Sequence, residues 1–225
     1  MNLIERMPTG IPGLDNMMEG GLPRPSLILL AGDAGAGKTT FCIQFLCKGA
    51  DLGEHGLCLL TFGGPPDLLF NYASSYEFVK STYFGKEICY LEMEEMVEKA
   101  CRSQDLLDML EREIDTFHPA RIVIENLSVL EDVLKDEYCR FLFKLSHLIK
   151  AKAVVALVAE DAQPGAPYPA QIAQVADGII LLQNVEINFA RRRSIEIVKM
   201  CGTAHHLGKH AVDISVKGLV VYPGL

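Results

Sequence analysis

A strand-like apolar run that ends in a glycine-rich loop, LILLAGDAGAGKTT at residues 27–40, constrains the fold more than any other stretch. It contains the pattern G-x-x-x-x-G-K-[ST], and an amphipathic segment follows it. The fixed positions of the pattern are Gly32, Gly37, Lys38 and Thr39. Glycines let the backbone turn its N–H groups inward, and the N-terminus of a following helix adds partial positive charge. The stretch therefore predicts a phosphate-binding loop.

Each residue of this loop has an expected role in holding a nucleoside triphosphate. Lys38 should reach the β- and γ-phosphates, and the Thr39 hydroxyl should ligate Mg²⁺. The other expected nucleotide contacts are Gly32, Asp33, Ala34, Gly35, Ala36, Gly37 and Thr40.

Length and composition limit the class of protein. The 225 residues, 49% of them hydrophobic, are enough for one α/β domain over residues 1–225, and no composition break indicates a second. The net charge of −8 disfavours indiscriminate binding to nucleic acid or anionic membranes, although a local basic patch could bind either. No apolar run approaches the roughly 18 residues of a membrane span, and the first residues do not resemble a secretory signal. Seven cysteines without a C-x-x-C pair fit reduced thiols, so we expect a cytoplasmic protein.

Apolar periodicity and turn residues predict alternating strands and helices, followed by a strand-rich C-terminus. Helices are expected at 14–18, 38–52, 67–76, 103–118 and 132–150. Strands are expected in the apolar run from residue 27 and at 57–62, 87–93, 121–125, 153–159, 178–182, 194–200, 211–215 and 219–222. We therefore expect an α/β fold in which helices flank a mainly parallel sheet and the C-terminal strands are antiparallel.

Carboxylates at strand ends are the expected partners of the loop. Hydrolysis at such a site needs one carboxylate that holds Mg²⁺, a second that activates water, and a cation for the transferred phosphoryl group. Glu125 closes the apolar strand at 122–124 and is the expected Mg²⁺ holder, while the alternative is a charge that happens to end a strand. Glu125 is one methylene longer than the usual aspartate, so contact with Mg²⁺ through water is also plausible.

Six stretches, in order and spacing across almost the whole chain, resemble the KaiC-like branch of the RecA/RadA ATPase superfamily. They are TGIPGLDNMMEGGLP at 9–23, GDAGAGKTTFCIQFL at 32–46, TFGGPPDLL at 61–69, RIVIENLSVL at 121–130, VAED at 158–161 and KMCGTAHHLGKHAVDISVKGLVVYP at 199–223. The last stretch lies outside the phosphate loop, so its match does not depend on that common motif. The resemblance implies a RecA-like core that binds ATP with Mg²⁺ and often assembles into hexameric rings with nucleotide between subunits.

Besides Glu125 in place of the family's metal-holding aspartate, which is a mild change, three positions depart from that family's pattern. Relatives that hydrolyse ATP carry two adjacent glutamates that polarise water, and these positions are Gly63 and Gly64 here. The family presents a lysine and an arginine to the γ-phosphate of the neighbouring subunit; the lysine is Lys199, but the arginine position is Cys201. Loss of a general base costs about 10²–10⁴ in rate, and loss of an arginine finger about 10³–10⁵. We therefore expect a regulatory or assembly protein that binds Mg·ATP and hydrolyses it weakly or not at all.

Two alternatives stay open. Asp67 or Glu160 could replace the missing base, which would make the chain an active KaiC-like ATPase. The other alternative is a RadA-paralogue repair accessory that binds single-stranded DNA through the loop at 163–169 and the basic run Arg191–Arg193. The same run could instead protect a strand edge against aggregation.

Two further groups of residues have simpler interpretations. Cys201, His205, His206 and His210 lie close together in the sequence, but their spacing matches no standard zinc pattern, and we interpret them as a hairpin near a subunit interface. Aromatic residues between 72 and 84 are interpreted as core or interface residues. The expected partners are ATP, further copies of the chain in a ring of up to six, or an unidentified protein.

Overall fold

The computed structural model describes residues 4–60, 71, 73–100, 102–163, 165–187 and 189–224. Half of the helix predicted at 67–76 lies outside these residues, namely 67–70 and 72. Gly63, Gly64 and Asp67 also lie outside the described residues, so the expectations about them stay predictions. In the part of the chain that is described, no helix has the length and apolar character needed to cross a membrane.

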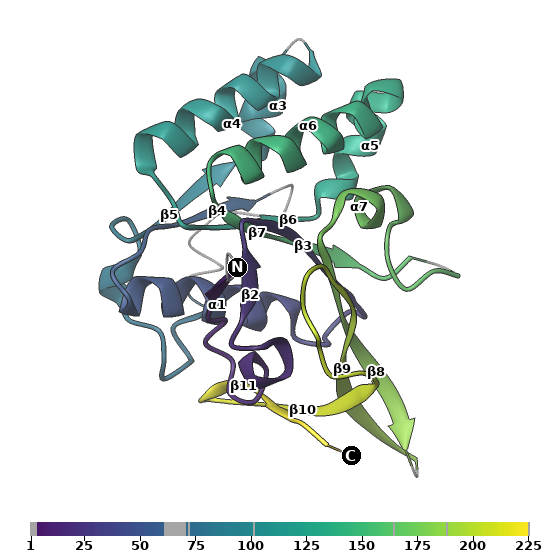
Figure 1. Ribbon diagram of the computed structural model, residues 1–225. Coiled ribbons are helices and arrows are strands. Elements are labelled where there is room, and N and C mark those ends of the chain that lie inside the picture. Colours follow the sequence, from purple (N-terminus) through teal and green to yellow (C-terminus); the bar gives the residue numbers. More distant parts are fainter. Residues whose placement is uncertain are drawn as a thin grey trace.

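A nine-stranded sheet, counted over the described residues, forms the centre of the molecule in the order β11-β10-β9-β8-β3-β7-β6-β4-β5 (Figure 1). The strands from β8 to β5 in this order run parallel. They are β3 (Ser26–Gly32), β4 (Gly56–Leu60), β5 (Ile88–Glu92), β6 (Arg121–Glu125), β7 (Val155–Asp161) and β8 (Gly178–Ile187). The carboxyl ends of parallel strands meet at one edge of the sheet, so this order brings the ends of β3, β6 and β7 together.

The C-terminal strands extend this sheet in antiparallel fashion. They are β9 (Ala190–Met200), β10 (Lys209–Ser215) and β11 (Gly218–Tyr222), and each pairs with the strand before it. The predicted combination of a mainly parallel core and antiparallel C-terminal strands is therefore confirmed. β8 and β9 are longer than predicted, and the basic run Arg191–Arg193 lies inside β9 rather than in a loop.

Helices cover both faces of the sheet, and the alternating side chains of its strands explain why. On β3, Ile28 and Leu30 join the core under α1 (Lys38–Asp51), whereas Leu27 and Leu29 join the opposite core. The opposite face is covered by α4 (Ser103–Phe117), α6 (Tyr138–Ala151) and α7 (Ala170–Val175), as Figure 1 shows. A strand buried on both faces reads as a continuous apolar run, which is the pattern of residues 27–31.

Several elements differ from the sequence prediction. The helix expected at 132–150 is split into α5 (Leu130–Leu134) and α6, because Lys135 takes a positive φ of 47° that interrupts the helix. The short helix expected at 14–18 is a 3₁₀ helix at Asp15–Met18. Among the described α-helices and strands, four were not predicted: α3 (Met93–Lys99), α7, and the strands β1 (Glu5–Met7) and β2 (Leu22–Arg24), which form a two-stranded ribbon.

Candidate functional site

The glycine-rich loop connects β3 to α1, as the sequence predicts. Gly35 and Gly37 have positive φ angles of 74° and 110°, which side chains with a Cβ rarely adopt. Gly32 is required for a different reason: a Cβ at this position would lie 1.9 Å from the carbonyl oxygen of Leu182. The first helical N–H groups of α1 have no partners inside the helix and face an anion-binding position.

The loop is anchored to the neighbouring strand β8. The Asp33 backbone N–H donates to the Leu182 carbonyl at 3.0 Å, and the Asn184 N–H donates to the Asp33 carboxylate at 2.7 Å. The Asn184 amide also donates to the Ala34 carbonyl at 3.2 Å. Asp33 therefore fixes the loop to the sheet, and it does not line the cavity described next.

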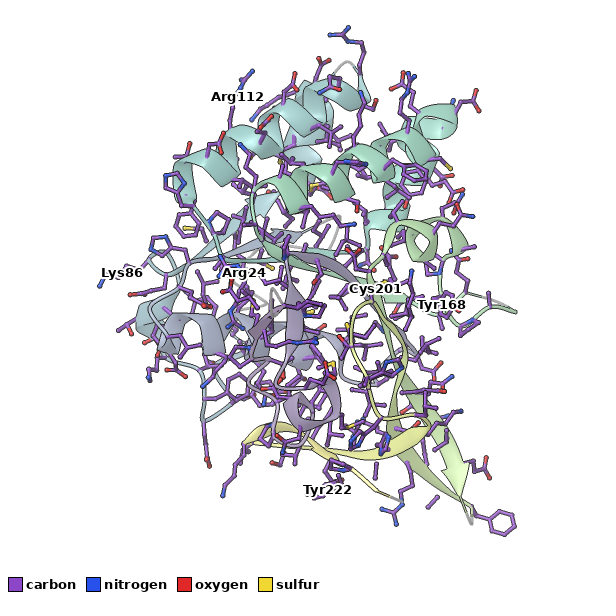
Figure 2. The ribbon with its side chains drawn as sticks, in the orientation of Figure 1. Arg24, Lys86, Arg112, Tyr168, Cys201 and Tyr222 are labelled. Atoms are coloured by element: carbon purple, nitrogen blue, oxygen red, sulfur yellow. The ribbon has the colours of Figure 1, made fainter. Side chains whose placement is uncertain are left out.

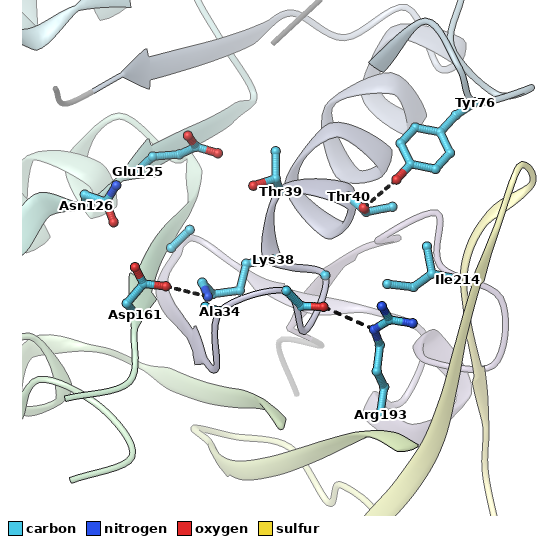
Figure 3. Close-up of a pocket in the computed structure, with 13 residues that line it drawn as sticks. Ala34, Lys38, Thr39, Thr40, Tyr76, Glu125, Asn126, Asp161, Arg193 and Ile214 are labelled. Atoms are coloured by element: carbon cyan, nitrogen blue, oxygen red, sulfur yellow. Dashed lines mark hydrogen bonds and ion pairs between the residues drawn. The ribbon is translucent and has the colours of Figure 1, made fainter. Parts of the chain in front are cut away.

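A cavity of about 520 Å³ lies beside the loop at the carboxyl edge of the sheet (Figure 3). Six of the predicted contacts line it: Ala34, Gly35, Gly37, Lys38, Thr39 and Thr40. The other lining residues include Tyr76, Glu125, Asn126, Asp161, Arg193 and Ile214. The structure thus brings the loop together with the predicted Mg²⁺ holder, and it adds polar groups from β7 and β9.

Lys38 is held by three oxygen atoms at the base of the cavity. Its ammonium donates to the carbonyls of Gly32 and Asp33 at 2.9 and 3.0 Å. It also forms an ion pair of 2.7 Å with Asp161, the last residue of β7 (Figure 3). The Lys38 side chain is 13% exposed, so an anion in the cavity can still reach it.

Thr39 and Glu125 offer oxygen atoms to a divalent cation. In Figure 3 the Thr39 hydroxyl points toward the side of the cavity where Glu125 lies. Burial raises the pKa of Glu125, and the charge of Lys38 acts in the opposite direction. A hydroxyl, a carboxylate and phosphate oxygens fit the preference of Mg²⁺ for hard ligands with few protein donors. The described residues contain no cluster of three or more His, Cys, Asp or Glu side chains that could bind a metal by themselves.

Sequence reasoning missed six residues that line the cavity, Asn126 and Ala159 among them. The Arg193 guanidinium donates from Nε to the Gly35 carbonyl at 3.2 Å, and Tyr76 and Thr40 share a hydrogen bond of 2.8 Å. Ile214 from β10 and Asp161 complete the group. Side-chain alternation along the basic run, had it been assigned to a strand, would have placed Arg191 and Arg193 on one face and Arg192 on the other. No local signal marks Tyr76 or Ile214, because both reach the cavity through the tertiary fold.

Glu160, predicted as a possible water-activating base, faces away from the cavity. Its carboxylate accepts hydrogen bonds from the Ser128 N–H at 3.0 Å and the Ser128 hydroxyl at 2.5 Å. It is 1% exposed and absent from the cavity lining, whereas the next residue, Asp161, lines it. Its role as a base stays a prediction, and in this geometry Glu160 orders the segment that follows β6.

Lys199 lies toward the end of the strands that is opposite to the loop. It pairs with Ile179, three residues before Leu182, which pairs with Gly32. Strands rise by about 3.3 Å per residue, so Lys199 starts about 10 Å along the sheet from the loop. Its ammonium donates to the carbonyl of Ala176 at 2.6 Å. Lys199 is therefore positioned away from its own loop, and its contact with a neighbouring subunit stays a prediction.

Cys201 follows β9 directly, whereas His210 lies in β10 and pairs with Ile195. Cys201 is exposed, and its N–H donates to the carbonyl of Asp177 at 2.9 Å. His206 and His210 have ring centres 6.5 Å apart, and His210 contacts the backbone of Leu207 and Gly224. These contacts fix a loop and a strand end, in line with the structural interpretation of the cluster.

Comparison with known proteins identifies the fold and the family of the site. The family model described as "ATPase: KaiC" matches residues 7–225. A UPF0273 protein of Thermotoga maritima is 28% identical over 98% of this chain and 97% of its own length. The circadian clock protein KaiC3 of Synechocystis is 30% identical over 98% of this chain, which spans 46% of that longer protein. The crystal structure of a KaiC-like protein from Pyrococcus horikoshii superposes with a TM-score of 0.85 at 28% identity, covering 98% of this chain and 100% of that one.

Proposed function

We propose a function from the premise that this chain belongs to the KaiC family of ATPases: it binds Mg·ATP, hydrolyses it slowly, and uses the bound nucleotide to stabilise an assembly. Membership of the family and the RecA-type P-loop fold support nucleotide binding. The slow hydrolysis and the role in assembly are our proposals.

The proposal is carried by a glycine-rich loop whose Lys38 and Thr39 line the cavity, together with the absence of a free carboxylate base among the described residues. Among the described residues, the carboxylates that line the cavity are Glu125 and Asp161. Glu125 is the proposed Mg²⁺ holder, and Asp161 is paired with Lys38 at 2.7 Å. Glu160 is occupied by Ser128. No described carboxylate is therefore poised to activate water, and the family's glutamate positions are Gly63 and Gly64.

The proposed binding mode assigns each wall of the cavity to a part of the nucleotide. The N–H groups at the start of α1 and the Lys38 ammonium would hold the β- and γ-phosphates. Thr39 and Glu125 would hold Mg²⁺, which when bound neutralises charge on the phosphates. Arg193 would add a second cation from β9, and Tyr76 and Ile214 offer the cavity a ring and an apolar side chain.

The proposed assembly follows from the position of Lys199. A lysine at the far end of the strands cannot serve its own loop, but it can face the loop of a second copy. Nucleotide bound between copies would then stabilise their contact by mass action. At about 100 times its dissociation constant, a ligand adds about 2.7 kcal/mol to the state that binds it.

Sizing the protein with and without Mg·ATP, while phosphate release is recorded, tests both parts of the proposal. We expect a larger species with Mg·ATP and little phosphate released, and we expect Lys199→Ala to bind Mg·ATP but to assemble less. Rapid phosphate release without any change in size would reject the proposal.

The alternative of an active ATPase with a relocated base can be separated by two variants. If Asp67 or Glu160 activates water, Asp67→Asn or Glu160→Gln should abolish a measurable turnover. We expect instead that turnover in the unmodified protein is already far below the common enzyme rate of about 1 s⁻¹.

A further inference from the structure

The segment between β9 and β10, residues 201–208, lies against the N-terminal part of the chain, and we call it the β9–β10 loop (Figure 1). It begins two residues after Lys199, the residue that we propose to face a second copy. The loop contains neither helix nor strand, so its shape depends on contacts with the rest of the chain.

Arg6, in the middle of β1, is the side chain that holds this loop most closely. Its Nη1 donates to the Thr203 hydroxyl at 2.6 Å, and its Nη2 donates to the Gly202 carbonyl at 3.1 Å. The Arg6 side chain is 16% exposed, so both bonds are largely shielded from water. Hydrogen bonds from an ionised donor are stronger than neutral ones. One arginine therefore fixes two consecutive positions that lie almost 200 residues away in the sequence.

Glu19 holds the Arg6 guanidinium in this orientation. Its carboxylate pairs with Nη2 of Arg6 at 2.5 Å. Glu19 itself has a φ of 55°, a left-handed conformation that is unfavourable for a residue with a Cβ. The turn after the 3₁₀ helix thus places the carboxylate where it orients the arginine toward the loop.

Two further contacts join the β9–β10 loop to the N-terminal segment. Gly202 has a φ of +64°, and a Cβ at this position would lie 2.6 Å from Cδ1 of Ile4, so the two residues pack closely. In the second half of the loop, the His206 N–H donates to the carbonyl of Met17 at 3.0 Å. The loop is therefore held on both sides of its middle by residues from the first 20 of the chain.

Leu207 follows these anchored positions, and its side chain is 80% exposed. Single exposed leucines are common on protein surfaces, so its exposure alone indicates nothing. Its position is informative because the loop that presents it is ordered beforehand. A loop that is already fixed loses less conformational entropy when it binds, and this loss is one of the main costs of association.

We propose that Arg6 is a positioning residue for assembly: it orders the β9–β10 loop in advance, so that Leu207 contacts a second copy of the chain. The inference rests on the assembly proposed above and adds to it a dependence on the N-terminal ribbon. Arg6 and Leu207 do not line the nucleotide cavity, so both act without touching the nucleotide.

Two measurements on the full chain test the proposal. Amide hydrogen exchange, followed by NMR, reports the order of the loop at Cys201 and His206, whose N–H groups donate to backbone carbonyls. Sedimentation velocity with Mg·ATP gives the protein concentration at half-assembly. Arg6→Ala should accelerate exchange at both amides and raise that concentration, each at least about tenfold, because bonds from a charged donor are lost. Its affinity for Mg·ATP should be unchanged.

Three variants separate the steps of the proposal. Arg6→Lys keeps the charge but loses the fork of donors, so it should give an intermediate result. If Arg6 acts through Thr203, Arg6→Ala/Thr203→Val should be little worse than Arg6→Ala alone, because the two residues form one interaction. Leu207→Ser should weaken assembly while it leaves the exchange rates in the loop unchanged.

Arg24 provides a matched control in the same ribbon. It lies in β2, donates to the carbonyl of Ala153 at 2.8 Å and pairs with Glu5 at 3.2 Å. Figure 2 shows Arg24 away from Cys201, where the β9–β10 loop begins. Arg24→Ala should leave both the exchange rates in the loop and the concentration at half-assembly unchanged.

The outcomes distinguish a failure of this proposal from a failure of the proposed function. Unchanged exchange in Arg6→Ala would overturn the proposal, and so would faster exchange with unchanged assembly. Equal effects of Arg6→Ala and Arg24→Ala would also overturn it, because they would indicate a general loosening of the ribbon. If the unmodified chain does not change its size with Mg·ATP, the proposed assembly fails, and the role of Arg6 in it is rejected at the same time.

Discussion

The ammonium group of Lys38 lies 2.7 Å from the carboxylate of Asp161, which ends the strand next to the glycine-rich loop. Together with the carbonyls of Gly32 and Asp33, this carboxylate satisfies the lysine before any phosphate arrives. A triphosphate must therefore compete with Asp161 for the lysine. Asp161 also places a negative charge in the wall of the cavity. We propose that the negatively charged phosphates bind in the same cavity.

This competition predicts that Asp161→Asn binds Mg·ATP more tightly than the unmodified chain. An ion pair with an exposed partner contributes about 0.2–1 kcal/mol, and the Asp161 side chain is 67% exposed. The dissociation constant should fall by roughly 1.4- to fivefold, as measured by isothermal titration calorimetry. Asp132→Asn, which removes a charge from α5 away from the cavity, should leave the affinity unchanged. Weaker binding by Asp161→Asn would show that this carboxylate contributes to holding the nucleotide.

The position of Arg193 predicts a loss of affinity when its charge is removed. A hydrogen bond to a charged group contributes about 1.5–3 kcal/mol, so Arg193→Gln should weaken Mg·ATP binding by at least tenfold. Arg191→Gln is the matched control, because Arg191 lies on the same strand but does not line the nucleotide cavity. Equal affinities of the two variants for Mg·ATP would show that Arg193 does not contact the nucleotide.

The packing of Gly32 against β8 predicts a strong effect on folding. In Gly32→Ala the new Cβ would lie 1.9 Å from the carbonyl oxygen of Leu182, and a backbone atom cannot move aside without disturbing the sheet. We expect a loss of several kcal/mol in urea unfolding, or failure to fold. Gly53→Ala is the control: φ is +76°, but no atom lies within 4 Å, so only backbone strain of about 1–2 kcal/mol is expected. Similar losses for both variants would contradict the close contact at Gly32.

Buried Glu160 predicts a pH dependence of stability. Burial raises its pKa above the ordinary 4.5, and its hydrogen bonds from Ser128 act in the opposite direction. Between the unfolded pKa and the raised folded pKa the folded state binds more protons, so this group makes stability fall as pH rises through that window. Glu160→Gln removes this titrating group. The free energy of unfolding of the variant should therefore rise relative to that of the unmodified chain from pH 4 upward. Urea unfolding at a series of pH values measures this difference.

A control with the opposite sign is available at Glu137. Hydrogen bonds from Ser103 lower the pKa of this exposed carboxyl, so its contribution to stability is present above the unfolded pKa and is lost as pH falls. Glu137→Gln should therefore lose stability relative to the unmodified chain as pH rises. The same direction for both variants would contradict the burial effect at Glu160.

Local signals predicted the glycine-rich loop and the acid at a strand end that line the cavity, and tertiary contacts determined the rest of the lining. The spacing from Gly32 to Thr39 and the acid at the end of an apolar strand identified the loop and Glu125, because both depend on residues close in sequence. Arg193 was misinterpreted because its strand was predicted to begin at residue 194, which left the basic run in a connection. Tyr76 and Ile214 reach the cavity only through the packing of distant segments, which no local pattern records.

The most direct test of the central claim measures Mg·ATP binding and phosphate release on the same preparation of the full chain. We expect saturable binding that Lys38→Ala abolishes, together with turnover far below about 1 s⁻¹. Turnover near or above that rate, lost in Asp67→Asn or Glu160→Gln, would contradict the claim that the protein binds ATP and hydrolyses it only slowly.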